Sequence, residues 1–211
     1  LEDWPLEFRF REDSAERSAR VDAFGLAGYD PDQRRHRLIA DLVRVHERAG
    51  DDAGTWEFVV HLVPEEARDR ILLCRVQPRA TLRETWEAAA GLVAQTRPAQ
   101  LLPHDQLVVP ELELELTHAF DELRGLRLAN PGWEEAWLAD VRQDLRLRLD
   151  EEGMVVRSVA WVAAGVMATP QPRRLVFDRP FLLAAVQEGA TQPYLLAWVA
   201  HPELLVPLAA R

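Results

Sequence analysis

Residue types that carry chemistry in proteins are present in this sequence but scattered along it. No two histidines stand at the spacing of metal ligands on one helix or strand beside a carboxylate with an obvious role. The six histidines are His36, His46, His61, His104, His118 and His201. The sequence also lacks an HExxH pair, a Gly-rich phosphate loop and a GxSxG turn. We therefore expect no catalytic residues, no metal site and no cofactor, so an enzyme is the least favoured class of function.

The acidic clusters and the single cysteine have simple structural explanations. Asp51 with Asp52, and Glu65 with Glu66, are typical of solvated turns. Cys74 lies in the apolar run RILLCRV, so we expect a buried thiol that packs as a small hydrophobic side chain. A lone thiol slightly favours a reducing compartment, but a secreted protein without disulfides would look the same. The cellular location therefore stays open.

The composition predicts a folded, soluble and acidic protein. Hydrophobic residues make up 48% of the 211 residues, and no uncharged apolar run reaches the ~18 residues of a membrane span. The formal net charge of -10 argues against nucleic acid and anionic membranes as partners. At this length one core suffices, so we expect a single domain over residues 1–211. Because the sequence begins with Leu, we expect that an upstream region has been removed or left out.

Two segments alternate strictly between apolar and charged residues, as half-buried strands do. In 111–116 leucines alternate with glutamates, and in 145–149 leucines alternate with arginines. We expect the two segments to be antiparallel neighbours in which Glu113 or Glu115 faces Arg146 or Arg148. Opposite charges that face each other across a ladder contribute ~0.2 to 1 kcal/mol per pair.

Other segments carry weaker signals of secondary structure. Thr81 and Glu84 form a capping box that predicts a helix over 82–95. Apolar runs predict strands in three further segments and a buried hairpin near the end of the sequence. The strands are expected within 5–10, 55–63 and 68–76, and the hairpin within 173–186 and 193–208.

Two segments are harder to assign. Asp30 followed by Pro31 is typical of a helix start, and Leu38, Leu42 and Val45 fall on one helical face, so the local sequence favours a helix over 31–49. The run HRLIADLVRV within it is also compatible with a strand. The segment 132–143 is helical in pattern at its start and runs into the alternating strand that follows it.

The order of motifs in the last third of the sequence resembles the carboxy-terminal part of the serpins. LRLRLDEEG, a long connecting run, LVFDRPFLLAAV and YLLAWVAHPE match the family's hinge strand, reactive-centre loop and two final strands. The resemblance places Glu151, Glu152 and Gly153 at the hinge. It gives a candidate reactive loop at Val166, Met167, Ala168 and Thr169.

The resemblance extends upstream in part and implies a fold. VVPELELELTHAFDELRGL is similar to the family's Leu-Pro-x-Phe strand and the helix after it. The implied fold is α+β, with antiparallel-rich mixed sheets and a few helices, in a reduced serpin-like core. Residues expected to be buried in it are Leu112, Leu114, Leu145, Leu147, Phe177, Phe181 and Trp198.

The sequence departs from an inhibitory serpin in two ways. The chain is about half as long as a usual serpin, and the family's amino-terminal helices have no counterpart here. Inhibitory members also carry Thr, Glu and small residues after the hinge glycine, whereas 154–159 reads MVVRSV. An exposed apolar strand is costly, because burying a Val or larger side chain contributes ~1.5 to 3 kcal/mol. We therefore expect 154–163 to be a strand built into the sheet, paired with 145–149 through DEEG.

Three functions follow in order of preference. The first is a non-enzymatic and non-inhibitory serpin-like binding or scaffold domain, because a reduced sheet fold exposes strand edges that natural proteins cover. A protein partner, a second copy or an upstream region of the chain would cover these edges. The second is a protease inhibitor or pseudosubstrate that acts through an exposed loop around 163–173. An enzyme is the third.

Overall fold

The computed structural model describes residues 2–27, 42–48, 57–62, 69–102, 104–133, 135–149 and 172–208. These residues form strands, one α-helix and two short 3-10 helices. In chain order they are β1 (Glu2–Glu12), β2 (Ala15–Ala27), β3 (Val43–Arg48), β4 (Glu57–Leu62), β5 (Asp69–Arg75), α2 (Leu82–Gln95), β6 (Gln106–Pro110), β7 (Leu112–Ala119), η1 (Asp121–Leu123), β8 (Arg142–Leu149), β9 (Arg174–Val176), β10 (Phe181–Gln187), β11 (Leu195–Val199) and η2 (Pro202–Leu204).

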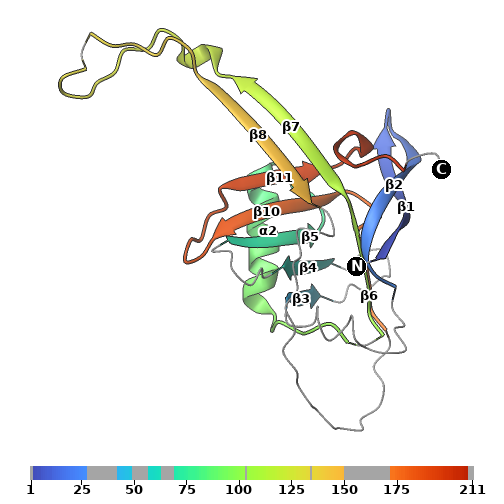
Figure 1. Ribbon diagram of the computed structural model, residues 1–211. Coiled ribbons are helices and arrows are strands. Elements are labelled where there is room, and N and C mark those ends of the chain that lie inside the picture. Colours follow the sequence, from blue (N-terminus) through green and yellow to red (C-terminus); the bar gives the residue numbers. More distant parts are fainter. Residues whose placement is uncertain are drawn as a thin grey trace.

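The strands form three sheets. A four-stranded sheet has the order β1-β2-β6-β9, and a five-stranded sheet has the order β11-β10-β5-β4-β3. The third sheet consists of β7 and β8, which extend away from the body (Figure 1). All pairs between neighbouring strands are antiparallel except β6 with β9. The expected α+β class with antiparallel-rich mixed sheets is confirmed.

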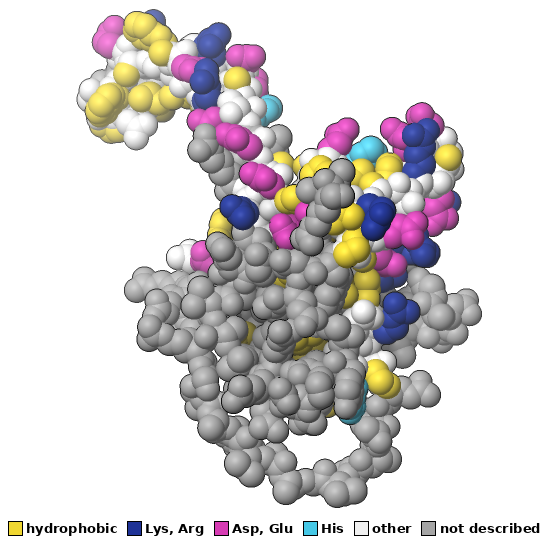
Figure 2. Space-filling model, turned by 45° about the vertical axis from the view of Figure 1, so that its right-hand side comes forward, with side chains coloured by type: hydrophobic (Ala, Val, Ile, Leu, Met, Phe, Trp, Pro, Cys, Tyr) yellow, Lys and Arg dark blue, Asp and Glu magenta, His cyan; other side chains and the backbone are white. Residues whose placement is uncertain are grey.

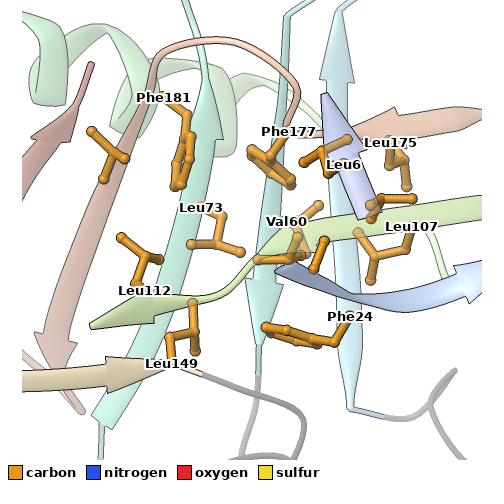
Figure 3. Close-up of a cluster of buried hydrophobic side chains, with 14 of the residues drawn as sticks. Leu6, Phe24, Val60, Leu73, Leu107, Leu112, Leu149, Leu175, Phe177 and Phe181 are labelled. Carbon is orange, nitrogen blue, oxygen red and sulfur yellow. The ribbon is translucent and has the colours of Figure 1, made fainter. Parts of the chain in front are cut away.

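The main core lies between the four-stranded and five-stranded sheets. Phe177 is fully buried and packs against both Phe58 and Phe181, with ring centroids 5.1 Å apart in each pair. Figure 3 shows Phe177 and Phe181 beside leucines from both sheets and from the start of β7. Phe177 and Phe181 are therefore buried, as expected from the sequence.

A second core fills the space between the five-stranded sheet and α2. Trp86 and Leu92 of the helix pack with Cys74 and Leu182 of the central strands. On β10, Phe181 and Leu183 enter the main core while Leu182 enters this one, because neighbouring side chains of a strand point to opposite faces. Burial on both faces explains why FLLAAV is a continuous apolar run.

The helix begins as its sequence predicts. Thr81 is the N-cap, and its side-chain hydroxyl accepts a hydrogen bond of 3.1 Å from the backbone N–H of Glu84. That bond satisfies one of the backbone donors that the first helical turn leaves without a partner. The expected helix over 82–95 is confirmed at both ends.

Gly25 allows β2 and β6 to approach closely. Its φ is +152°, and a Cβ placed on it would lie 1.9 Å from the carbonyl oxygen of Leu107. Any other residue would therefore collide with the backbone of β6, whose pairing with β2 closes the middle of the four-stranded sheet.

The helix favoured over 31–49 is wrong for the part that the structure describes. Val43–Arg48 is strand β3, paired with β4, and Val43 and Val45 are fully buried. Two β-branched residues at alternate positions suit a strand, and pairing with β4 outweighs the weak helical pattern. Residues 31–41 lie outside the described residues.

The expected start of a helix at 132 is also wrong. Leu138 donates a backbone hydrogen bond of 2.9 Å to Leu126, and Leu128 donates one of 3.0 Å to Ala136, so two extended segments face each other. Gly132 turns the chain between them with a φ of +85°. The helix implied after β7 is only the single 3-10 turn η1, because hydrogen bonds between 120–128 and 136–141 continue the strand pair instead.

The expected burial holds for most of the predicted core positions. Leu112 and Leu114 are buried, whereas Leu147 and Trp198 are only half-buried. Leu147 lies on β8, whose only strand partner among the described strands is β7, and Trp198 lies on β11, an edge strand of the five-stranded sheet. An edge position leaves part of a large side chain in solvent. The side chain of Leu145 lies outside the described residues.

Candidate functional site

The segment that the resemblance marks as functional lies outside the described residues. It comprises the hinge Glu151, Glu152 and Gly153, the expected strand over 154–163, and the candidate reactive loop Val166, Met167, Ala168 and Thr169. The structure describes the two stems of this segment. β8 leads into it and ends at Leu149, and β9 follows it from Arg174. These predictions therefore stay predictions.

The stem after the segment is held by a buried ion pair. Asp105 is fully buried, and its carboxylate accepts hydrogen bonds from the backbone N–H and from Nε of Arg173, both 2.9 Å long. Nη2 of Arg173 lies 2.5 Å from Oδ2 of Asp105. The same carboxylate accepts a bond of 2.7 Å from the backbone N–H of Leu102. Asp105 thus ties Arg173 to the loop that precedes β6.

Arg173 reaches further partners on β3 and in the loop before β6. Nη1 lies 3.1 Å from Oε1 of Glu47 on β3, and Nη2 donates a bond of 2.6 Å to the carbonyl oxygen of Gln100. Burial lowers the pKa of the Arg173 guanidinium, but hydrogen bonds and charges from Asp105 and Glu47 outweigh burial and raise it. The guanidinium therefore stays charged, and it fixes the chain directly after the segment 150–171.

The stem before the segment is the strand pair β7 with β8. Its register places Glu113 opposite Arg148 and Glu115 opposite Arg146, so the expected pairing of the two alternating segments is confirmed. Leu112 lies opposite Leu149, and both are buried in the main core. The base of the pair is therefore anchored, while Glu113, Glu115 and Arg148 are exposed.

The arm, defined here as β7, β8 and the connecting residues 120–141, carries a feature that the sequence reasoning missed. At its far end Leu126, Trp133 and Trp137 are 50%, 61% and 63% exposed. Figure 2 shows hydrophobic side chains gathered at the far end of the arm. Exposed tryptophans are uncommon on a surface that meets only water and are enriched at protein interfaces. The segment GWEEAW contains both tryptophans, but its interpretation as the start of a helix gave no reason to expect them on the surface.

Metal-binding side chains do not cluster within the described ranges, and the one cysteine is shielded from solvent. No group of three or more His, Cys, Asp and Glu side chains there could hold a metal ion. Cys74 is buried, and burial raises the pKa of its thiol well above the ordinary value, which makes it unreactive. The helix that the structure describes is too short and too polar to cross a membrane.

The sequence and the fold were compared with protein families, curated proteins and solved structures. No family model matches the sequence. No curated protein matches it either. Among solved structures, the chain is similar to native protease nexin-1 with heparin, at 11% identity and a TM-score of 0.55, over 94% of this chain and 52% of that one.

Two further serpins are similar in structure. The insect serpin Serpin48 of Tenebrio molitor, described as highly specific, matches at 9% identity and a TM-score of 0.50, over 93% of this chain and 50% of that one. Thyroxine-binding globulin in complex with thyroxine matches at 13% identity and a TM-score of 0.52, over 94% of this chain and 52% of that one. The chain therefore has a serpin-like fold and spans about half the length of the serpins that it matches.

Proposed function

We propose that residues 1–211 form a single serpin-like domain that binds another protein chain or acts as a scaffold, without enzymatic or protease-inhibiting activity. The observation that carries this proposal is the arm. A two-stranded pair is marginally stable by itself in water, and β7 and β8 pair only with each other among the described strands. A further chain that packs on the arm would stabilise it.

The exposed end of the arm supports binding of a protein. Trp133 and Trp137 combine a large apolar area with an N–H donor, a combination that is frequent in the energetic centre of protein interfaces. The fold is compatible with a binding role, since thyroxine-binding globulin shares it in its complex with thyroxine.

The absence of inhibition is proposed from the sequence of the segment after the hinge. Met154, Val155, Val156 and Val159 are apolar and favour a strand that stays in the sheet. Incubation with a panel of serine and cysteine proteases tests this proposal, with an inhibitory serpin and its target as the positive control. We expect no covalent complex that survives denaturing electrophoresis. A stable complex, with the chain cut near Met167, would instead favour a protease inhibitor acting through the loop around 163–173.

Binding through the arm has its own experiment, with a second copy of the chain as the partner tested. Sedimentation equilibrium compares the wild type with the variant Trp133→Ser/Trp137→Ser and with Tyr194→Ser, which removes an exposed aromatic side chain elsewhere. We expect association that weakens only in the double variant. A monomer at every concentration, or equal association in all three proteins, would contradict self-association through the arm.

A further inference from the structure

A cavity of about 480 Å³ opens where the four-stranded and five-stranded sheets meet. None of the residues that line it belongs to the arm. Its lining brings together four arginines that are distant in sequence: Arg9 and Arg11 on β1, Arg75 at the end of β5, and Arg179 just before β10. Phe10, Pro180 and Trp198 contribute apolar wall. This size and this mixture of apolar wall with a few charged groups are typical of small-molecule sites.

Arg75 is the fixed member of the group. Its Nη1 donates hydrogen bonds of 2.7 Å to the carbonyl oxygen of Val176 and 3.1 Å to Oδ1 of Asp178, and its guanidinium lies 5.8 Å from the centre of the Phe58 ring. Both hydrogen bonds come from Nη1. Among the described residues, Nε and Nη2 have no partner, so they remain as donors on a side chain that the protein already holds in place.

The positive charges in the cavity exceed the acids that could balance them. Asp178 pairs with Arg75, and Glu16 lies opposite Arg11 in the register of β1 with β2. The remaining acid of the lining, Glu57, accepts a bond of 3.0 Å from the backbone N–H of Gln77 and lies 4.0 Å from Arg48.

Arg9 and Arg179 therefore carry the unbalanced charge. Neither has a side-chain hydrogen bond or an ion pair within the described part of the chain. The pKa of Arg75 is lowered first by burial, against the charge of Asp178, and further by the charge of Arg179, so the two guanidiniums repel each other. A bound anion would relieve this repulsion.

We propose that this cavity binds a small anion with two carboxylates on an apolar or aromatic body. Planar guanidinium groups match carboxylates with two parallel hydrogen bonds, and Phe10, Pro180 and Trp198 would contact the apolar body. Two carboxylates would balance Arg9 and Arg179. The carboxylates could belong to a free metabolite or to acidic side chains of a peptide. This site is independent of the arm and of the function proposed above.

Isothermal titration calorimetry with isophthalate, an aromatic dicarboxylate, tests the proposal. The variants are Arg9→Gln and Arg179→Gln, and the matched control is Arg97→Gln, which removes the same charge from an exposed position outside the cavity. We expect saturable binding that weakens at least about tenfold in each cavity variant and less than about twofold in the control. Neutral isophthalamide should not bind.

A second ligand distinguishes between the two sources of carboxylates, a free small molecule and a peptide. A short peptide with two glutamates on either side of a tryptophan is titrated under the same conditions. Tighter binding of the peptide than of isophthalate indicates a protein partner, and the reverse indicates a free small molecule. Absence of saturable binding for both ligands, or equal weakening in Arg179→Gln and Arg97→Gln, would overturn the site.

Discussion

At the scale of single residues, the best-defined feature is the buried pair of Asp105 with Arg173. Asp105 accepts hydrogen bonds from Arg173, directly after the segment 150–171, and from Leu102, shortly before β6. Removing one partner of a buried ion pair destabilises a protein far more than replacing both partners with apolar residues. The reason is that the remaining charge stays buried without compensation.

We predict that Asp105→Asn lowers the free energy of unfolding by about 3 to 5 kcal/mol. The physical reason is that the Arg173 side chain is only 13% exposed and would lose its main counterion. Urea unfolding followed by circular dichroism measures this loss. The control is Arg174→Gln, whose exposed side chain bonds Gln106, and it should change stability by less than about 0.5 kcal/mol. A similar loss in both variants would refute the role of the pair.

His61 gives the protein a predicted sensitivity to acid. Burial, together with the charges of Arg70, His46 and Arg44, lowers the pKa of His61 from 6.5 to about 4, and burial is the largest cause. Its Nε2 is buried and has no hydrogen-bond partner among the residues that the structure describes. Because the unfolded chain binds the proton first, stability is complete above pH 6.5 and is lost as the pH falls toward 4.

His61→Gln should flatten this loss of stability. Gln is neutral throughout, so the difference in unfolding free energy between pH 7 and pH 4.5 should shrink by about 1 to 2 kcal/mol, allowing for partial solvent contact. Urea titrations at a series of pH values measure the slope. His104→Gln changes a histidine whose side chain is exposed, and an equal flattening there would count against the assignment to His61.

At the scale of elements, strong local patterns predicted structure well and weak ones did not. The Leu–Glu and Leu–Arg alternations predicted β7, β8 and their pairing, because period two and charge complementarity agree there. The helix pattern over 31–49 failed at Val43 and Val45, since pairing with β4 decides that strand and is not a local property. The candidate cavity could not be predicted either, because Arg9, Arg75 and Arg179 meet only after both sheets form.

The cap of α2 provides a test at this scale. Thr81→Ala removes the hydroxyl that accepts from Glu84, and we expect a loss of about 0.5 to 2 kcal/mol in unfolding free energy. Thr81→Ser keeps an accepting hydroxyl and should lose much less. Chemical denaturation of both variants is the measurement, and equal losses would show that the methyl group of Thr81 matters more than the hydrogen bond.

At the scale of the whole molecule, we predict that 154–163 is already part of the sheet. The native state is then the relaxed one, and proteolysis within 166–173 should release no stored energy. We expect the unfolding midpoint to shift by a few degrees or less, because about 1 kcal/mol moves the midpoint by about 2 to 4 °C in a domain of this size.

Differential scanning calorimetry before and after limited proteolysis measures the shift. The cut must be located by mass spectrometry, so that cleavage elsewhere is not mistaken for cleavage in this segment. A rise of tens of degrees would mean that the segment inserts only after cleavage, and inhibition would then be the better interpretation.

The order of the strands also has a consequence for how the chain is made. β9 completes the four-stranded sheet by pairing with β6, so this sheet cannot be complete before residue 176 has left the ribosome. The five-stranded sheet needs β10 beside β5 and β11 beside β10, so it cannot be complete before residue 199. Until β9 and β10 have been made, β6 and β5 lack a neighbour along one edge, and their apolar side chains remain open to unwanted partners. Since distant pairings form slowly, the nascent chain should depend on chaperones over this interval more than a fold closed by local hairpins would.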